Sequence, residues 1–109
     1  MRLFILAAFL FFSATAQCQQ AAFETGNSLR QKLYAKSNIA NGIAYGYILG
    51  VHDSWSGIMI CTQIGADPSQ MILIVRKFLS DHPEKLHYSA MSLVADALRE
   101  AFPCPHSEK

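Results

Sequence analysis

Charged residues are scarce in this sequence, and neither sign is in excess. Only 16% of the 109 residues are charged, and the formal net charge is +1. Residues 17–109 keep eight basic residues (the nine less Arg2) against eight acidic ones, and no basic cluster stands out. Nucleic acids and anionic membranes select strongly basic surfaces. The charge pattern therefore argues against both as partners.

The sequence also lacks an apolar run of about 20 residues, which is the length that spans a bilayer. Leu3–Phe12 is apolar throughout but has only ten residues. Met1-Arg2 precedes this run, and Ser13-Ala14-Thr15-Ala16 follows it with small residues where a signal peptidase cleaves. We therefore predict a secretory signal peptide at 1–16 and a single mature domain at 17–109, with its core at about 26–104.

Cysteine is limited to Cys18, Cys61 and Cys104. A secreted domain of this size is marginally stable and gains from a disulfide. Cys18 lies among glutamines near the predicted cleavage site, whereas Cys61 and Cys104 each end an apolar segment. We therefore predict a Cys61–Cys104 disulfide and leave the role of Cys18 open.

No stretch alternates apolar and polar residues as a half-buried strand does, so we predict an all-α fold. The expected architecture is a small bundle of about four helices at 28–35, 39–60, 67–80 and 88–101. Thr25 or Asn27 can cap the first helix, and Asp67-Pro68-Ser69-Gln70 has the composition of a capped helix start. The residues expected to face inward are Leu29 and Leu33; Met71, Ile74, Val75, Phe78 and Leu79; and Ala90, Met91, Val94, Ala97, Leu98 and Ala101.

Residues 41–57, NGIAYGYILGVHDSWSG, place glycines at helical spacing. On a helical wheel the strip formed by Gly42, Gly46, Gly50, Asp53 and Gly57 covers about 80°. Each interior glycine costs about 1 kcal/mol relative to alanine, so a compensating contact is expected. We predict that the strip lets the alanine-rich last helix approach closely, with a ligand or a partner helix as the alternative. Because the rest of this helix is apolar, we expect it to be buried.

Catalytic and cofactor motifs are absent from the sequence. Residues 53–57, DSWSG, lack both the G-x-S-x-G spacing and the preceding strand of a serine elbow. His52 and Asp53 are adjacent, so on a helix they point about 100° apart and we expect no shared relay. His82 and His87 have no third metal ligand placed by spacing. We therefore predict no enzymatic activity, no catalytic residues, no metal and no cofactor.

Trp55 is the only tryptophan in the sequence. Tryptophan is a frequent anchor of protein interfaces. Its polar neighbours His52, Ser54 and Ser56 suggest a helix edge where an aromatic ring meets water. A buried core position remains an equal alternative.

A set of spaced residues extends over most of the chain, from 26 to 104. It comprises Gly26-Asn27-x-Leu29, Gly46-Tyr47-Ile48-x-Gly50-Val51-x-Asp53, Cys61, Gln70, Val75-x-Lys77-x-Leu79, His82-Pro83-Glu84, Leu86-His87, Ala90, Ala97-Leu98 and Ala101-Phe102-Pro103-Cys104. In this combined spacing the chain resembles the Rap/Tai family of type VI secretion immunity proteins. It departs from the family in having no cysteine just after the first motif, where Lys32, Leu33 and Tyr34 stand. Ser89 also replaces a proline that often precedes the last helix.

The resemblance implies an all-helical periplasmic protein, commonly a homodimer, that binds a cell-wall amidase delivered by type VI secretion. Such toxins are papain-like Cys–His enzymes, and the immunity protein occludes their cleft. We expect the partner surface at the Trp55 edge or the His82–Tyr88 loop. The candidate residues are His52, Trp55, His82, Glu84, Lys85, His87 and Tyr88. The alternative function is a periplasmic helical binding or chaperone-like module of unknown ligand.

Overall fold

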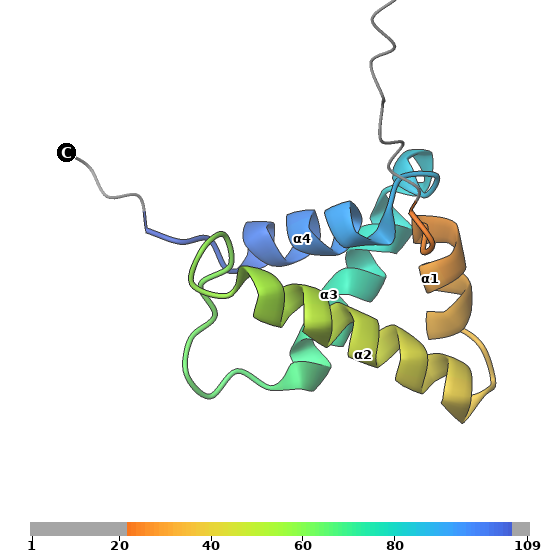
Figure 1. The fold of residues 1–109 in the computed structure, drawn as a ribbon, viewed down its shortest axis with the longest axis horizontal. Coiled ribbons are helices and arrows are strands. Elements are labelled where there is room, and N and C mark those ends of the chain that lie inside the picture. Colours follow the sequence, from red (N-terminus) through yellow and green to blue (C-terminus); the bar gives the residue numbers. More distant parts are fainter. Residues whose placement is uncertain (1–21, 106–109) are drawn as a thin grey trace, which may run out of the picture.

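Residues 22–105, the part of the chain described by the computed structural model, form four α-helices and one short 3₁₀ helix (Figure 1). They are α1 (Gly26–Leu33), α2 (Asn38–Trp55), α3 (Pro68–Asp81), η1 (Pro83–Lys85) and α4 (Ala90–Ala101). The predicted all-α class is confirmed. The predicted signal peptide and Cys18 lie outside the described residues. Within 22–105, no helix is both long and apolar enough to cross a bilayer.

The helices begin where side chains satisfy their first backbone N–H groups. Asp67 accepts a hydrogen bond from the backbone N–H of Ser69 (2.9 Å), and Gln70 completes a capping box, as predicted. Thr25 and Ser28 form the same reciprocal arrangement at the start of α1, so Thr25 is the cap of that helix. Each such cap is worth about 1 kcal/mol, so these short helices start at defined residues.

Helix α2 ends at Trp55, earlier than the predicted end near Ile60. Ser56 is extended, and Gly57 adopts a φ of +79°, which L side chains rarely adopt. The backbone N–H of Gly57 donates to the carbonyl of Ile60 (2.9 Å), which closes a turn. Gly57 is therefore a turn residue, and its prediction as part of the helical strip is wrong.

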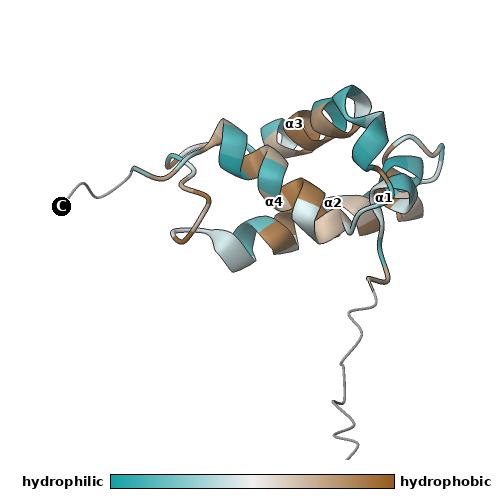
Figure 2. Ribbon diagram, turned by 90° about the horizontal axis from the view of Figure 1, so that it is seen from above, coloured by the Kyte–Doolittle hydropathy of each residue, from teal (hydrophilic) through white to brown (hydrophobic). Residues whose placement is uncertain are grey.

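Helices α2 and α4 converge toward one end of the molecule, and α3 crosses behind them (Figure 1). Apolar and polar residues alternate in bands along α3 and α4 (Figure 2), which is the pattern of helices with one buried face. The largest fully buried side chains are Leu29, Leu33, Ile48, Ile60, Val75, Leu79, Leu93, Val94 and Leu98. Burying one such side chain contributes roughly 1.5–3 kcal/mol, so this core dominates the stability.

The inward faces of α3 and α4 differ slightly from those predicted. Ile72, Leu93 and Ala95 are buried although they were not predicted to be, whereas Met91 and Ala101 are exposed. The difference is a rotation of each buried face by about one residue. It follows from the way α3 crosses its neighbours, which periodicity does not specify.

The predicted disulfide between Cys61 and Cys104 is present. Their Cα atoms lie 4.8 Å apart, and the backbone N–H of Cys61 donates to the carbonyl of Phe102 (2.9 Å). The bond joins the segment after α2 to the segment after α4. It therefore fixes the end at which these two helices converge.

The prediction that α4 packs on the glycine strip is wrong. Gly42, Gly46 and Gly50 are exposed, and a Cβ built on any of them meets no atom within 4 Å. The buried residues of α2 lie on its other face, at Ala44, Ile48 and Val51. Asp53 is exposed as well and pairs with His52 rather than supporting helix packing. The expectation that α2 is buried all round is also wrong, since exposed apolar residues such as Ile39 and Ile43 accompany the glycines.

The close backbone approach in this fold occurs at Gly26 instead. A Cβ built on Gly26 lies 2.5 Å from Cδ1 of Leu93 and 2.9 Å from both Cα and the carbonyl oxygen of Leu86. Two of these three atoms belong to the backbone of Leu86 and cannot move aside independently. A side chain at position 26 would therefore force α1 away from the segment that precedes α4.

We expect Gly26→Ala to destabilise the protein by about 1–3 kcal/mol, the usual cost of overpacking a tight contact. Gly46→Ala is the matched control, because it adds the same methyl group where nothing is in contact. It should stabilise the protein by up to about 1 kcal/mol through helix propensity. Urea unfolding of both variants measures the difference. Equal effects of the same sign would contradict the assignment of the close contact to Gly26.

We expect Cys61→Ser and Cys104→Ser to lower the melting temperature equally, with no further loss in the double variant. The chain-entropy model gives about 4 kcal/mol for closing a loop between residues 43 positions apart. Thermal denaturation followed by circular dichroism measures all three variants. Losses that add in the double variant would show that the two thiols act independently.

Candidate functional site: the α3–α4 loop and groove

The loop from His82 to Ser89 connects α3 to α4 and contains five of the seven predicted interface residues. The backbone N–H of His82 donates to the carbonyl of Phe78 (3.1 Å), which ends α3. Pro83 opens the single 3₁₀ turn η1, and Leu86 is buried beneath it. The loop is thus anchored to the core from inside and has a defined helical turn at its tip.

Backbone hydrogen bonds also tie this loop to the start of α1. The N–H groups of Gly26 and Asn27 donate to the carbonyls of Tyr88 (3.0 Å) and Leu86 (2.8 Å). The N–H of Ala90 donates in turn to the carbonyl of Glu24 (2.9 Å). The small size of Gly26 permits this approach. The loop is therefore held in one conformation before any partner arrives.

The side chains of the loop form an exposed, mixed surface. Glu84 is 63% exposed, and its carboxylate lies 3.4 Å from Nδ1 of His82. The rings of His87 and Tyr88 pack at 4.2 Å between centroids, and half of Tyr88 remains exposed. Lys85 places its Nζ 5.9 Å from the ring centroid of Phe78. Aromatic, acidic and basic groups thus lie within one short segment, as at many protein interfaces.

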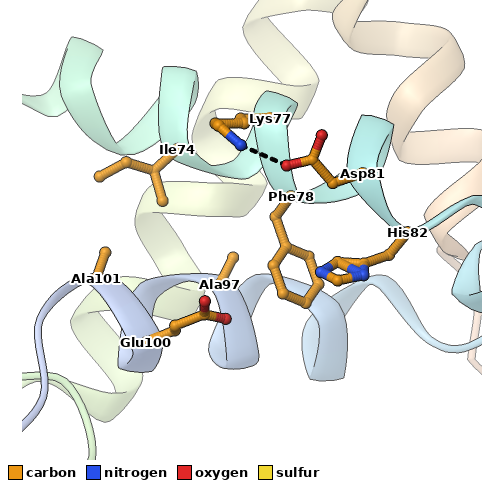
Figure 3. A pocket seen from close by; sticks show the side chains of 8 residues that line it. All are labelled: Ile74, Lys77, Phe78, Asp81, His82, Ala97, Glu100 and Ala101. Carbon is orange, nitrogen blue, oxygen red and sulfur yellow. Dashed lines mark hydrogen bonds and ion pairs between the residues drawn. The ribbon is translucent and has the colours of Figure 1, made fainter.

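A groove of about 290 Å³ runs between α3 and α4 beside this loop (Figure 3). Its lining residues are Ile74, Lys77, Phe78, Asp81, His82, Ala97, Glu100 and Ala101. Figure 3 shows His82 lying against the Phe78 ring at one end, and the two ring centroids are 4.3 Å apart. Lys77 donates to Asp81 at the rim (2.5 Å).

An adjoining hollow of about 360 Å³ continues the groove toward Lys85 and Arg99. It shares Phe78, His82 and Glu100 with the groove itself. The loop and the two hollows therefore form one continuous surface with an apolar floor and charged edges. Such a surface suits a polypeptide segment better than a small molecule.

The other predicted edge, at the end of α2, lies at the opposite end of the molecule (Figure 1). Trp55 is partly buried and packs against the core, so it matches neither a fully buried nor a fully exposed position. It lines a shallow hollow of about 370 Å³ together with Gly46, Gly50 and Met91. The structure therefore does not bring His52 and Trp55 together with the His82–Tyr88 loop.

His52 and Asp53, which we expected not to form a relay, are nevertheless in contact. The Asp53 carboxylate accepts from Nδ1 of His52 (2.9 Å), which leaves Nε2 to accept from the Thr62 hydroxyl (2.7 Å). The order hydroxyl, imidazole, carboxylate is that of a hydrolase relay. However, Asp53 is 81% exposed, and Thr62 lines none of the four hollows found between the helices. The arrangement ties the segment after α2 back onto that helix.

Apart from His82, the groove residues were not predicted from the sequence to be functional. Ile74 and Phe78 were predicted as inward-facing, and they are partly buried and form the groove floor. Phe78 and His82 lie four positions apart, a spacing that brings side chains together on a helix. That spacing is the one signal in the sequence that indicates their pairing. No cluster of three or more metal-binding side chains occurs among residues 22–105.

A family model described as Rap1a immunity proteins matches residues 14–104. The chain belongs to the Rap1a immunity protein family. The match extends over the loop, the groove and both disulfide cysteines, and it confirms the family resemblance of the sequence motifs. A comparison with curated proteins found no match. Membership of the Rap1a family implies that the partner of this chain is a toxin.

In this Rap1a family member, Glu24 ties the start of α1 to the rest of that helix. Its carboxylate accepts from Nζ of Lys32 (2.5 Å) and from the Ser28 hydroxyl. Burial alone would raise the pKa of Glu24, but these hydrogen bonds and the charge of Lys32 together hold it below its ordinary value of 4.5. Because the folded pKa is lowered, this carboxylate stabilises the folded protein above pH 4.5. The stabilisation is lost as the pH falls through the folded pKa.

We therefore expect Glu24→Gln to be less stable than the wild type at neutral pH, with the difference shrinking as the pH falls below 4.5. Glu100→Gln is the control, since it makes the same charge change on an exposed residue of α4. Urea unfolding at a series of pH values measures both. A stability difference that stays constant through the acid range would contradict the role of the Glu24 charge.

Proposed function

We propose that this protein is a periplasmic immunity protein that binds and occludes a peptidoglycan amidase delivered by type VI secretion. The observation that carries the proposal is the Rap1a family match over residues 14–104. The resemblance to Rap/Tai proteins supplies the finer statement, that the toxin is a papain-like amidase. The protein would protect the cell that produces it.

The α3–α4 loop supports inhibition by occlusion. A cleft enzyme is blocked when a protruding segment fills its substrate site, and a segment that is already ordered loses little entropy on binding. The backbone bonds from Gly26 and Asn27 order this loop. Tyr88 and Glu84 project from it and are available to enter a cleft. We assign the groove beside the loop to contacts with the rim of the toxin.

The disulfide supports a periplasmic location. Disulfides persist in oxidising compartments such as the bacterial periplasm and are rare in the cytosol. Cys61 and Cys104 are bonded in the structure, and the sequence predicts a signal peptide at 1–16. We propose that the protein reaches the periplasm through this signal and meets the toxin there.

We also propose that the protein acts as a homodimer, as the family resemblance implies. The glycine strip of α2, with Ile39 and Ile43, leaves an apolar face uncovered within residues 22–105. Burial of such a face by a second copy removes apolar area from water. Light scattering of the mature protein in solution measures the oligomeric state directly.

The function is tested by expressing a periplasm-directed amidase from the same genome, with and without this protein, in a sensitive host. We expect growth to be restored by the wild type. Tyr88→Ala should weaken inhibition by about tenfold or more, as expected for loss of an aromatic anchor. Ile64→Ala is the control, because Ile64 is exposed in the distant segment between α2 and α3. Absence of protection against every amidase of that genome would refute the proposal.

A further inference from the structure

A second groove lies between α2 and α3 and shares no lining residue with the α3–α4 groove. It has a volume of about 300 Å³ and is almost entirely apolar. Its walls include Tyr45, Leu49, Pro68, Ile72, Leu73 and Arg76. Leu73 is 61% exposed at its rim. Such a volume is at the lower end of the range for binding sites, so it fits one large side chain and its neighbours.

One end of this groove is formed by the guanidinium of Arg76. Its Nη2 donates to the carbonyl of Leu33 (2.7 Å), which satisfies the C-terminal end of α1. The same atom lies 3.5 Å from the Tyr45 hydroxyl. Its Nε is buried and has no acceptor among the described residues. The packing of α1 against α3 therefore holds the guanidinium in place at the groove.

A second cation, Arg30, lies against the same aromatic ring as Arg76. The guanidinium carbons of Arg30 and Arg76 lie 5.6 Å and 5.5 Å from the centroid of the same ring, that of Tyr34. Lys32, Lys77 and Arg99 each pair with a carboxylate. Within residues 22–105, no carboxylate pairs with Arg30 or Arg76. Two cations without a counter-ion produce a local positive potential that attracts an anionic group.

We propose that the α2–α3 groove docks an acidic segment of the partner protein, with one apolar side chain in the groove and a carboxylate at its Arg76 end, where Arg30 adds to the positive potential. The occupant must supply both parts. A purely apolar segment would leave the two guanidinium groups without a counter-charge. A polyphosphate would supply the charge but would leave the exposed Leu73 side chain at the rim in contact with water. The identity of the partner as the amidase rests on the proposed function. The acidic and apolar character of the occupant is inferred from the groove alone.

The groove is tested first by itself, with N-acetyl-leucyl-glutamate and its neutral amide analogue N-acetyl-leucyl-glutamine as probes. In ¹H–¹⁵N NMR titrations of the mature protein, the acid should shift the amide signals of Leu49, Leu73 and Arg76. It should bind at least about threefold more tightly than the amide, as expected for an exposed charge pair. Arg30→Glu should remove this difference. Arg30 is exposed and contacts the Tyr34 ring at the surface, so this substitution leaves the buried core unchanged.

Either of two results would overturn the inference: equal binding of the two probes by the wild type, or shifts centred on other residues. Groove signals that move with protein concentration, before any probe is added, would identify a second copy of this chain as the occupant. That result would also refute the acidic partner segment.

The second experiment measures affinity for the amidase. Leu73→Asp should weaken binding by about tenfold or more, whereas Ile58→Asp should not, since Ile58 is comparably exposed but lies outside the groove. If both variants bind as the wild type does, the groove is not the docking surface, although the proposed function stands. If the wild type binds no amidase, the proposed function fails. The probe titration alone then tests whether the groove binds an acidic segment.

Discussion

The way the helices of this protein pack depends on one backbone contact, between the first turn of α1 and the segment that leads into α4. Gly26 allows the two chains to approach until their N–H and carbonyl groups bond directly. This contact orders the α3–α4 loop and places α1 against α4. It also sets α1 where its last carbonyl, at Leu33, can accept from Arg76. Both proposed binding surfaces of the molecule therefore depend on the position of α1.

Local features of the fold could be predicted from the sequence, because their causes are local. The caps at Thr25 and Asp67 and the helical period of α3 lie within a few residues of the elements that they define. The disulfide could be predicted because only three cysteines occur, and one of them is near the predicted cleavage site. The need for glycine at position 26 was not predicted. It arises from Leu86 and Leu93, which are distant in sequence.

Helix α2 shows where sequence patterns mislead. Its composition is apolar on nearly every side, yet a domain of this size cannot cover such a helix completely. The buried face is set by Ala44, Ile48 and Val51, and the glycines are left facing solvent. The contact between His52 and Asp53 was missed for another reason. The angle between adjacent helical positions describes backbone directions, and a histidine side chain is long enough to reach its neighbour.

The candidate site was predicted only in part. The His82–Tyr88 loop is continuous in sequence, and its proline and polar residues mark it as exposed. The grooves are formed by residues of two helices each, and their existence depends on how α3 crosses its neighbours. The pairing of Arg30 and Arg76 over Tyr34 likewise joins α1 to α3. A single sequence contains no signal for such contacts between helices.

The Cys61–Cys104 bond closes a covalent ring that contains α3, the loop and α4. Both walls of the α3–α4 groove belong to this ring, whereas α1 and α2 lie outside it. A peptidase that cuts the exposed loop would therefore open the ring without releasing a fragment. The two ends at the cut would stay tethered through the disulfide and the packed helices. A cut within the loop that we propose to face the toxin would thus leave both halves of the molecule covalently joined.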